Sequence, residues 1–533
     1  MRTDTKVVVI GAGIGGLTTA ALLAKAGMDV TVLEAHVDPG GCAATFYHQG
    51  YRFDAGATLV GGFQPGGAHD LVGQALGIPW PVRRSDPAME VVLPDERVSR
   101  WGDPERWEAE RRRVFPGTER FWRAQEWAAD RLWRFSASAP AWPAQRLSDF
   151  PRLLARIRPE LLGLAPGAVG SVADWARLLG ASGRAFRTFV DAQLLISAQA
   201  TSEKVTPLYG AVALDLARQG VYHVERGVGG IAETLVGTIR RLGGKVLFKR
   251  RVQSILMRGG KAIGVRALSG PRHATRVEEY LSDIVIANVT PWSLTGLLSG
   301  DESGEDAFLT SDPGPQGSSA PMWGAFTMYL GVDDGVAPPD GPEHYQVVVD
   351  DRQPLGEGNS AFISVSPTWD ASRAPAGQRA VTLSTHTDVG PWWRIAQDRA
   401  AYEDRRDEYA ERLIRAGERA LPGLRRHIRL ALPGTPVTFR YYTQRPLGMV
   451  GGFPQTSLFR ARGPRTSVGN VLLVGDSIFP GQSTAGVSIG ALRVASEILG
   501  RQARPITRRG GQSGSRPAHR SIARDAEPVQ NQS

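Results

Sequence analysis

Residues 6–16 of the chain read KVVVIGAGIGG, and this stretch decides the fold class. The β-branched run from Val7 to Ile10 is typical of a parallel strand that is covered on both faces. Glycines then follow at the spacing G-x-G-x-x-G, at the opening of a helix predicted from about Gly15 to Ala26. With a second strand from Met28 to Leu33, the pattern predicts the dinucleotide-binding βαβ unit of an α/β protein.

Each glycine of this turn has a predicted task. Gly11 permits the tight turn, Gly13 lets a pyrophosphate approach the backbone, and Gly16 lets the helix pack closely on the strand. The N-terminus of the helix then stabilises the anion. Glu34 ends the second strand, where a carboxylate accepts hydrogen bonds from ribose hydroxyls, so the pattern favours FAD or NAD over NADP.

Later segments favour FAD over NAD. Pro39-Gly40-Gly41 and Phe53-Asp54-Ala55-Gly56 place small residues and a carboxylate where an extended dinucleotide would continue. The segment Val471–Asp476 reads VLLVGD, as if the chain returned near its end to complete the same site. No second G-x-G-x-x-G follows a strand, so we expect no separate nicotinamide site.

The remaining patterns indicate two discontinuous domains and a tail. A helix from about Gly230 to Leu242 and strand runs at 245–248, 263–267 and 284–287 repeat the dinucleotide-like pattern. Residues 80–200 show helical periodicity, including one apolar helix face formed by Phe121, Ala124, Ala128, Leu132 and Phe135, which we interpret as core. Between about 320 and 450, alternating segments such as 361–365 and 380–385 indicate strands.

From these patterns we predict three parts. A Rossmann-like FAD-binding domain of the GR2 type comprises residues 1–80, 220–300 and 465–500. An inserted substrate-binding domain of mixed sheet and helices comprises residues 81–219 and 301–464, and its helical part is expected to face a membrane. Residues 501–533 are rich in Arg, Gly, Ser, Pro and Gln without apolar periodicity, which predicts a disordered basic tail.

Composition excludes several functional classes. The net charge is +10, but the tail alone holds seven Arg against Asp525 and Glu527, so the body is only mildly basic and no nucleic-acid partner is expected. Cys42 is the single cysteine, and the histidines show no H-x-x-x-H spacing, so we assign no disulfide and no metal. His69 lies in a glycine-rich stretch near the expected flavin, where it could act as an acid or base, but we favour a loop histidine that hydrogen-bonds backbone. No catalytic residue or oligomeric state is assigned.

The sequence predicts a cytoplasmic protein attached peripherally to a membrane. No window approaches the roughly 20 apolar residues that span a bilayer, and the start of the chain does not resemble a signal peptide. Arg152, Arg156 and Arg158 alternate with Leu153, Leu154 and Ile157, a pattern that suits contact with anionic lipid. The alternative is an ordinary amphipathic helix packed on the core.

The chain resembles the flavin amine oxidase and phytoene desaturase superfamily, and within it the carotenoid C-3′,4′ desaturases. The matching stretches are Val8–Gly16, Pro39–Phe46, Phe53–Thr58, Gly66–His69 and Gly475–Gln482. The resemblance implies cofactor contacts at Gly11, Gly13, Gly16, Glu34, Gly41, Asp476 and Gly486, and a backbone contact to adenine near Val252. The family often has a basic residue after the paired glycines, where this chain has Cys42, and the difference weakens a phosphate contact there.

The resemblance implies an FAD-dependent oxidoreductase that desaturates a carotenoid at C-3′,4′ of an acyclic, 1′-hydroxylated or methoxylated end. Removal of hydrogen reduces the flavin, so oxygen or a quinone is needed as electron acceptor. A carotenoid cis–trans isomerase that uses reduced FAD is an alternative, because Gly475–Gln482 also resembles the isomerase branch. A second alternative is a non-catalytic carrier of prenylated partners, which the intact C-terminal segment disfavours.

Overall fold

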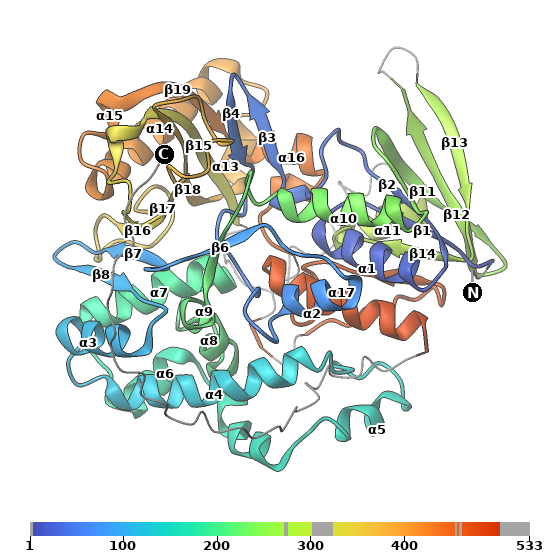
Figure 1. The fold of residues 1–533 in the computed structure, drawn as a ribbon, viewed down its shortest axis with the longest axis horizontal. Helices are drawn as coiled ribbons and strands as arrows, with labels where there is room; N and C mark the ends of the chain where they lie inside the picture. Colours follow the sequence, from blue (N-terminus) through green and yellow to red (C-terminus); the bar gives the residue numbers. More distant parts are fainter. Residues whose placement is uncertain (1–3, 271–274, 301–322, 453–455, 458–460, 501–533) are drawn as a thin grey trace, which may run out of the picture.

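The computed structural model describes residues 4–270, 275–300, 323–452, 456–457 and 461–500 (Figure 1). The predicted tail, 501–533, lies outside the described residues. A parallel five-stranded sheet has the order β10-β2-β1-β14-β20. Its strands come from the beginning, middle and end of the chain: β1 (Lys6–Ile10), β2 (Asp29–Leu33), β10 (Lys245–Leu247), β14 (Ile284–Ala287) and β20 (Val471–Leu473). This arrangement confirms the Rossmann-like α/β fold.

Helices cover this sheet and explain the apolar run of the first strand. α1 (Ile14–Lys25) connects β1 to β2, and α10 (Gly230–Arg241) and α17 (Thr484–Ile498) pack against α1. Val9 of β1 and Leu17 of α1 are both fully buried. Each such side chain contributes about 1.5–3 kcal/mol to folding by leaving water.

The strand expected at residues 263–267 does not join the parallel sheet. It is part of β12 (Lys261–Ser269), which lies between β11 (Arg250–Arg258) and β13 (Arg276–Leu281) in a separate antiparallel sheet. The turn between β11 and β12 is Gly259-Gly260, and both glycines have positive φ, +57° and +75°. Such a two-residue turn brings the next strand back antiparallel, whereas a parallel neighbour needs a longer crossover.

A seven-stranded sheet forms the second domain, in the order β19-β15-β18-β17-β16-β7-β8. Its strands are β7 (Met89–Val92), β8 (Arg97–Arg100), β15 (Trp323–Asp333), β16 (His344–Val348), β17 (Ser360–Val365), β18 (Gln378–Asp388) and β19 (Ile428–Gly434). α14 (Arg399–Ala420) packs on one face, and α13 (Val389–Arg394) and α15 (Leu424–His427) lie near it. Val381 and Leu383 of β18 are fully buried in the core that this face shares with α14. The alternate residues of β18 therefore point to the opposite face.

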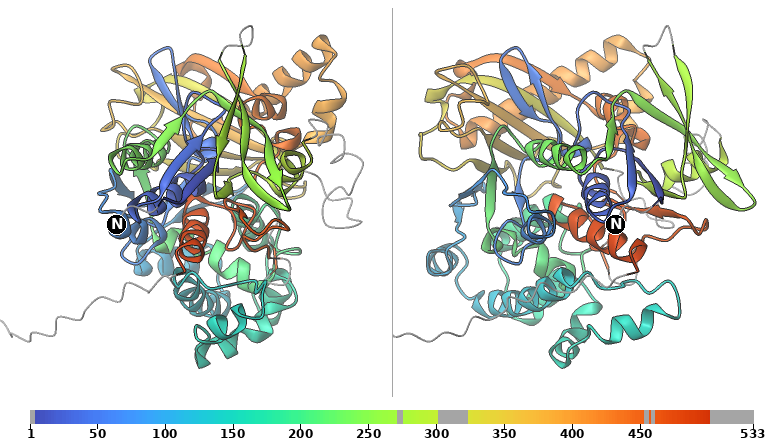
Figure 2. Two further views of the ribbon diagram at one scale, coloured as in Figure 1. Left: turned by 90° about the vertical axis from the view of Figure 1, so that its right-hand side faces the viewer. Right: turned by 45° about the vertical axis from the view of Figure 1, so that its right-hand side comes forward.

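A layer of helices packs against the β8 and β16 part of the seven-stranded sheet, and it is drawn as the cyan and teal ribbons of Figure 2. Between β5 and β9 the α-helices are α2 (Ala68–Leu76), α3 (Pro104–Val114), α4 (Glu119–Ala137), α5 (Asp149–Leu154), α6 (Val172–Leu178), α7 (Arg184–Ala198), α8 (Pro207–Ala213) and α9 (Leu216–Gln219). Phe121, Ala128 and Leu132 of the predicted apolar face of α4 are buried. Among the described residues, no helix combines the length and hydropathy needed to cross a bilayer.

Short elements connect the two domains. β3 (Thr45–His48) pairs with β4 (Tyr51–Asp54), and β9 (Val221–Val224) pairs with both β5 (Val60–Gly61) and β6 (Val82–Ser85). The remaining helices are α11 (Pro291–Ser299) and α16 (Pro436–Thr443), and the 3₁₀ turns are η1 (Gly41–Ala43), η2 (Pro159–Ala168), η3 (Asp334–Val336) and η4 (Pro446–Gly448). α16 and η4 pack together, and α16 also contacts η1, so the C-terminal half reaches the Rossmann-like domain.

Candidate active site

The first glycine turn is packed so closely that side chains have no room. Gly11 has a φ of +89°, which suits the turn after β1. A Cβ at Gly13 would lie 2.5 Å from Nδ2 of Asn288, and one at Gly16 would lie 2.6 Å from the carbonyl oxygen of Gly11. Gly13 is the N-cap of α1, and no side chain caps that helix. The N-terminus of α1 therefore keeps amide groups for an anion, as a dinucleotide diphosphate requires.

Glu34 is held at the end of β2, beside this turn. One carboxylate oxygen accepts a hydrogen bond from the amide of Ala12 at 2.7 Å, and the other accepts one from the amide of His36 at 2.8 Å. These bonds fix the carboxylate on the wall of the cavity described below. Each carboxylate oxygen can accept more than one hydrogen bond, so Glu34 can still receive ribose hydroxyls.

Two further glycine turns, far apart in the sequence, lie against the first. The amide of Gly40 donates to the carbonyl of Ala12 at 2.8 Å, and a Cβ on Gly41 would lie 3.7 Å from the Cα of Gly13. A Cβ at Gly15 would lie 3.1 Å from the backbone of Gly475. The chain thus returns near its end to the turn that follows β1, as the sequence predicts.

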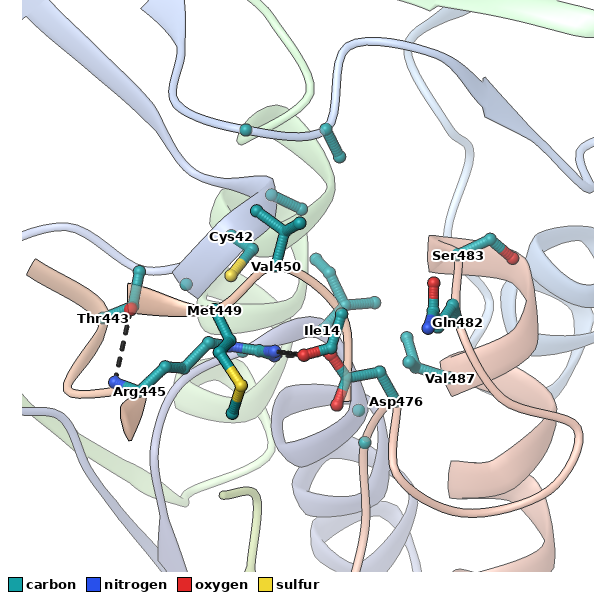
Figure 3. A pocket seen from close by; sticks show the side chains of 18 of the residues that line it. Ile14, Cys42, Thr443, Arg445, Met449, Val450, Asp476, Gln482, Ser483 and Val487 are labelled. Atoms are coloured by element: carbon teal, nitrogen blue, oxygen red, sulfur yellow. Dashed lines mark hydrogen bonds and ion pairs between the residues drawn. The ribbon is translucent and has the colours of Figure 1, made fainter. Parts of the chain in front are cut away.

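Arg445 joins these two turns, and no motif of the sequence identifies it. It follows α16, and its guanidinium forms an ion pair with Asp476 and donates to the carbonyl of Gly451 (Figure 3). The Cys42 thiol lies close to the same guanidinium (Figure 3). Burial lowers the pKa of Arg445, but the Asp476 carboxylate outweighs burial and holds the pKa above its ordinary value. Burial raises the pKa of Cys42, which is therefore an uncharged thiol.

A single cavity of about 730 Å³ contains most of the predicted cofactor residues in its wall. They are Gly11, Gly13, Glu34, Gly41, Val252 and Asp476. Gly16 and Gly486 do not line the cavity. Gly486 donates its amide to Ser483 Oγ at 3.0 Å in the first turn of α17, and neighbouring residues of that turn line the cavity. Val252 lies on β11 and lines the cavity, as do its neighbours Arg250 and Arg251.

The cavity extends from the glycine turns to the seven-stranded sheet and the helical layer. Its sheet wall includes one cross-strand row in which Ser384 pairs with Thr327 and Phe362, and Phe362 pairs with Gln346. The helical wall is mainly apolar and includes Leu132, Trp133, Phe135, Leu208 and Val212. Phe135, which the helical periodicity places in the core, is instead only partly buried and faces the cavity.

His386 adds a polar group to this wall. His386 lies two residues after Ser384 on β18, so its side chain is on the same face of the sheet. It pairs with Ala325 of β15. The ring lies edge-on to Trp323, with 5.8 Å between centroids, and no described residue hydrogen-bonds its nitrogens. Burial lowers the pKa of His386 to about 4, so the imidazole is neutral at neutral pH and has one donor and one acceptor. Tyr209 of α8 also lines the cavity, and its buried hydroxyl has no hydrogen-bond partner among the described residues.

His69 is not in a loop and does not reach the cavity wall. It lies in the first turn of α2, where its Nε2 is 3.1 Å from Oγ1 of Thr484 and its ring stacks on Phe63. Burial lowers its pKa to about 3. The expectation of a loop histidine bonded to backbone is wrong, because the glycine-rich stretch before it ends at the N-cap Gly67. His69 packs α2 against α17 and has no access to a ligand in the cavity.

Comparison with known proteins agrees with this architecture. Residues 9–72 match the NAD(P)-binding Rossmann-like domain. The chain is 30% identical to the chloroplastic prolycopene isomerase of Daucus carota over 94% of this chain and 81% of the relative. The chain belongs to the carotenoid isomerase and desaturase family.

Other members and neighbours support the same placement. The neurosporene-forming phytoene desaturase of Rhodobacter capsulatus is 26% identical over 94% of this chain and 95% of its own length. The structure of cyclohexylamine oxidase from Brevibacterium oxydans matches with a TM-score of 0.56 and 16% identity, over 94% of this chain and 100% of that one. This last likeness concerns the fold. The family implies a flavin, and the open N-terminus of α1, the fixed Glu34 carboxylate and the three adjoining glycine turns fit FAD.

Proposed function

We propose that this chain is an FAD-dependent desaturase that introduces a C-3′,4′ double bond into an acyclic carotenoid end carrying a 1′-hydroxyl or methoxy group. The observation that carries the proposal is the continuity of one cavity. It reaches from the glycine turns, which suit the cofactor, to a chamber with largely apolar walls. A polyene offers few polar groups, so its position has to come from the shape of such a chamber.

Two polar groups of the cavity wall, one on the sheet and one on α8, support an oxygen-bearing end. His386 and Tyr209 both lack hydrogen-bond partners among the described residues, although both lie in the wall. An unpaired polar group in an apolar chamber is costly unless a ligand or water satisfies it. A hydroxyl oxygen can accept from a neutral imidazole or a phenol, and a methoxy oxygen can do the same. A pure hydrocarbon leaves both groups unpaired.

The chemistry requires little of the side chains beyond positioning. FAD, held by the glycine turns and Glu34, would supply the acceptor for a hydride from an allylic carbon, and oxygen or a quinone would take up the electrons. A neighbouring proton of the substrate would be lost in the same oxidation. The extended π-system spreads the developing positive charge, so no strong base has to stand beside the substrate. We infer that the walls fix which bond faces the cofactor and exclude water, and we assign no general base.

A carotenoid cis–trans isomerase is the second candidate. The identity of 30% to a prolycopene isomerase, against 26% to a phytoene desaturase, favours it. The two reactions differ in redox balance, because isomerisation causes no net oxidation and consumes no acceptor. The cavity suits a polyene in either reaction, so product analysis is needed to separate them.

Peripheral attachment to a membrane is part of the proposal. The segment around α5 exposes Leu154 and Ile157, which are 65% and 40% exposed, and Phe150, which is 52% exposed. Arg152 and Arg158 are exposed beside them. Leu153 and Asp149 are buried, and Asp149 pairs with Arg465, so the segment is fixed to the body through these side chains and leaves others for a lipid surface. Such contact would bring a lipid-dissolved substrate to the enzyme.

The deciding experiment starts from the flavin-loaded protein. Purified protein is expected to be yellow and to release FAD on denaturation. Incubation with a 1′-hydroxylated acyclic carotenoid and a quinone should yield a product two hydrogens lighter that absorbs at longer wavelength. Incubation of the reduced protein with prolycopene, without acceptor, is the parallel arm. A product of unchanged mass and altered geometry there, with no desaturation in the first arm, identifies the isomerase and overturns the proposal.

A further inference from the structure

An uncharged thiol occupies a position beside the phosphate-binding turn. Cys42 directly follows Gly41, where a Cβ would lie 3.7 Å from the Cα of Gly13. A dinucleotide diphosphate carries two negative charges, and the glycine turn offers only backbone amides and the α1 dipole to balance them. The helix dipole is equivalent to about half a positive charge. A further cation at this place would strengthen binding of the diphosphate.

Arg445 brings a cation to this place from the other end of the chain. Its guanidinium lies beside the Cys42 thiol and pairs with Asp476, which follows Gly475. The turn of Gly41 and Cys42 lies against Gly13 of the first glycine turn. The turn of Gly475 and Asp476 lies against Gly15. The guanidinium is thus located at the glycine turn by two independent contacts. Figure 3 shows the Arg445 side chain crossing the cavity wall toward Asp476, with Cys42 and Ile14 close by.

The charges of the cavity wall suit an anionic ligand. Among the described residues, its charged groups are four arginines and two carboxylates: Arg250, Arg251, Arg440, Arg445, Glu34 and Asp476. Arg250 and Arg251 lie on β11, whereas Arg440 lies on α16. Arg250 pairs with Glu278 of β13, and burial together with the nearby charge of Arg251 lowers the pKa of Arg440. Arg445 is the arginine of this wall that pairs with Asp476 and interacts with Cys42.

We propose that Arg445 binds the diphosphate of FAD and supplies the positive charge that Cys42 does not. Asp476 and the carbonyl of Gly451 orient the guanidinium and use only part of its five N–H donors, so others remain for phosphate oxygens. The segment η4, which follows Arg445, bends back over the same wall, since Met449 and Val450 also line the cavity. The proposal concerns cofactor binding and is independent of the identity of the substrate.

The test measures the Kd of the full-length apoprotein for FAD by quenching of flavin fluorescence. Arg445→Gln should raise the Kd roughly tenfold to hundredfold, because charge-assisted hydrogen bonds are lost, and the loss should shrink as salt is raised. The decisive arm is Cys42→Arg in the Arg445→Gln background, which restores a cation at the glycine turn and should recover most of the affinity. Arg429→Gln is the matched control, because it also breaks an arginine–aspartate pair, with Asp333 on the surface.

Controls separate phosphate binding from a merely structural role. If Arg445 only neutralises Asp476, the double variant Arg445→Gln/Asp476→Asn should bind FAD better than Arg445→Gln alone, while Cys42→Arg should bring no recovery. That pair of results overturns the proposal, as does an unchanged Kd in Arg445→Gln. Thermal melting of each apoprotein checks folding. Should Arg445→Gln not fold, Arg445→Lys, which keeps the charge but loses the fork geometry, must bind FAD more weakly than the native protein for the proposal to stand.

Discussion

At the scale of single residues, the Glu34 carboxylate has two tasks that an experiment can separate. It accepts hydrogen bonds from Ala12 and His36 and so shapes the turn after β2, and it leaves lone pairs for ribose hydroxyls. Glu34→Gln should raise the Kd for FAD roughly tenfold or more, because charge-assisted hydrogen bonds weaken. Glu233→Gln on the exposed part of α10 is the control and should leave the Kd unchanged. Equal FAD affinity in the Glu34 and Glu233 variants would contradict the assignment.

His386 gives a second prediction at this scale. If its neutral imidazole hydrogen-bonds an oxygen of the substrate, His386→Leu should lower kcat/KM for a 1′-hydroxylated carotenoid about two- to tenfold. Activity on the corresponding hydrocarbon should not fall, because no hydrogen bond is lost there. Burial keeps the pKa of His386 near 4, so kcat/KM of the native enzyme should show no titration of this residue between pH 5 and 8. A loss that is the same for both substrates would argue for a purely structural role.

Arg445 and His386 also show why sequence reasoning found only part of the site. The residues it predicted, such as Gly13 and Glu34, belong to one local βαβ unit, whose spacing carries the chemistry. Arg445 reaches that unit only because α16 folds back over η1, and His386 faces the cavity only because of the register of β18. Neither the contact of α16 with η1 nor the register of β18 can be predicted from the sequence around these residues. The one signal in the sequence was Cys42, an uncharged residue at a place where a cation is common in the family.

At the scale of elements, local periodicity predicted whether most segments form helices or strands. It did not predict which strands far apart in the sequence pair with one another. The helices α1 and α10 and the strand β14 begin and end close to the predicted bounds. The pairing of β7 with β16 was not predicted, since it joins residues near 90 to residues near 346. The strand predicted at 263–267 is present in β12, but its place in an antiparallel sheet was not predicted, because a strand pattern does not reveal its neighbours.

The α5 segment allows a test of membrane contact by one element. Replacing Leu154 and Ile157 by Ser removes exposed apolar side chains, which are 65% and 40% exposed, without opening the core. We expect the variant to lose most of its cosedimentation with anionic vesicles at low salt, while its FAD content stays the same. Leu178→Ser, at another exposed apolar site, is the control. If the native protein itself does not sediment with these vesicles, the attachment is refuted.

At the scale of the whole molecule, a buried network of charges joins β9 to the seven-stranded sheet domain. Nε2 of His223 is 2.9 Å from Oδ2 of Asp370, and its Nδ1 is 3.3 Å from Oε2 of Glu343. Arg373 and Asp54 form a neighbouring buried pair at 2.9 Å, and His344 lies next to Glu343 in the chain. Removing one member of such a network leaves uncompensated buried charge, which is strongly destabilising. The two domains are thus coupled through ionic groups as well as apolar packing.

The pH dependence of stability should report on this junction. Burial lowers the pKa of His223, but hydrogen bonds to Asp370 and Glu343 outweigh burial and raise it above its ordinary value. A raised histidine pKa stabilises the fold below the unfolded value of about 6.5, and this stabilisation is lost as the pH rises through the folded pKa. The native protein should therefore have a higher Tm than His223→Gln, and this difference should be larger at pH 6 than at pH 9.

His344 supplies an internal control of opposite sign. Burial lowers its pKa to about 4, so its protonation between pH 6.5 and 4 opposes folding. His344→Gln should consequently gain stability relative to the native protein as the pH falls from 7 to 5, whereas His223→Gln should lose it over the same range. Differential scanning calorimetry of both variants with flavin bound measures the two trends in one buffer series. Parallel trends in the two variants would mean that the histidines act through packing alone, and that the junction carries no net ionic coupling.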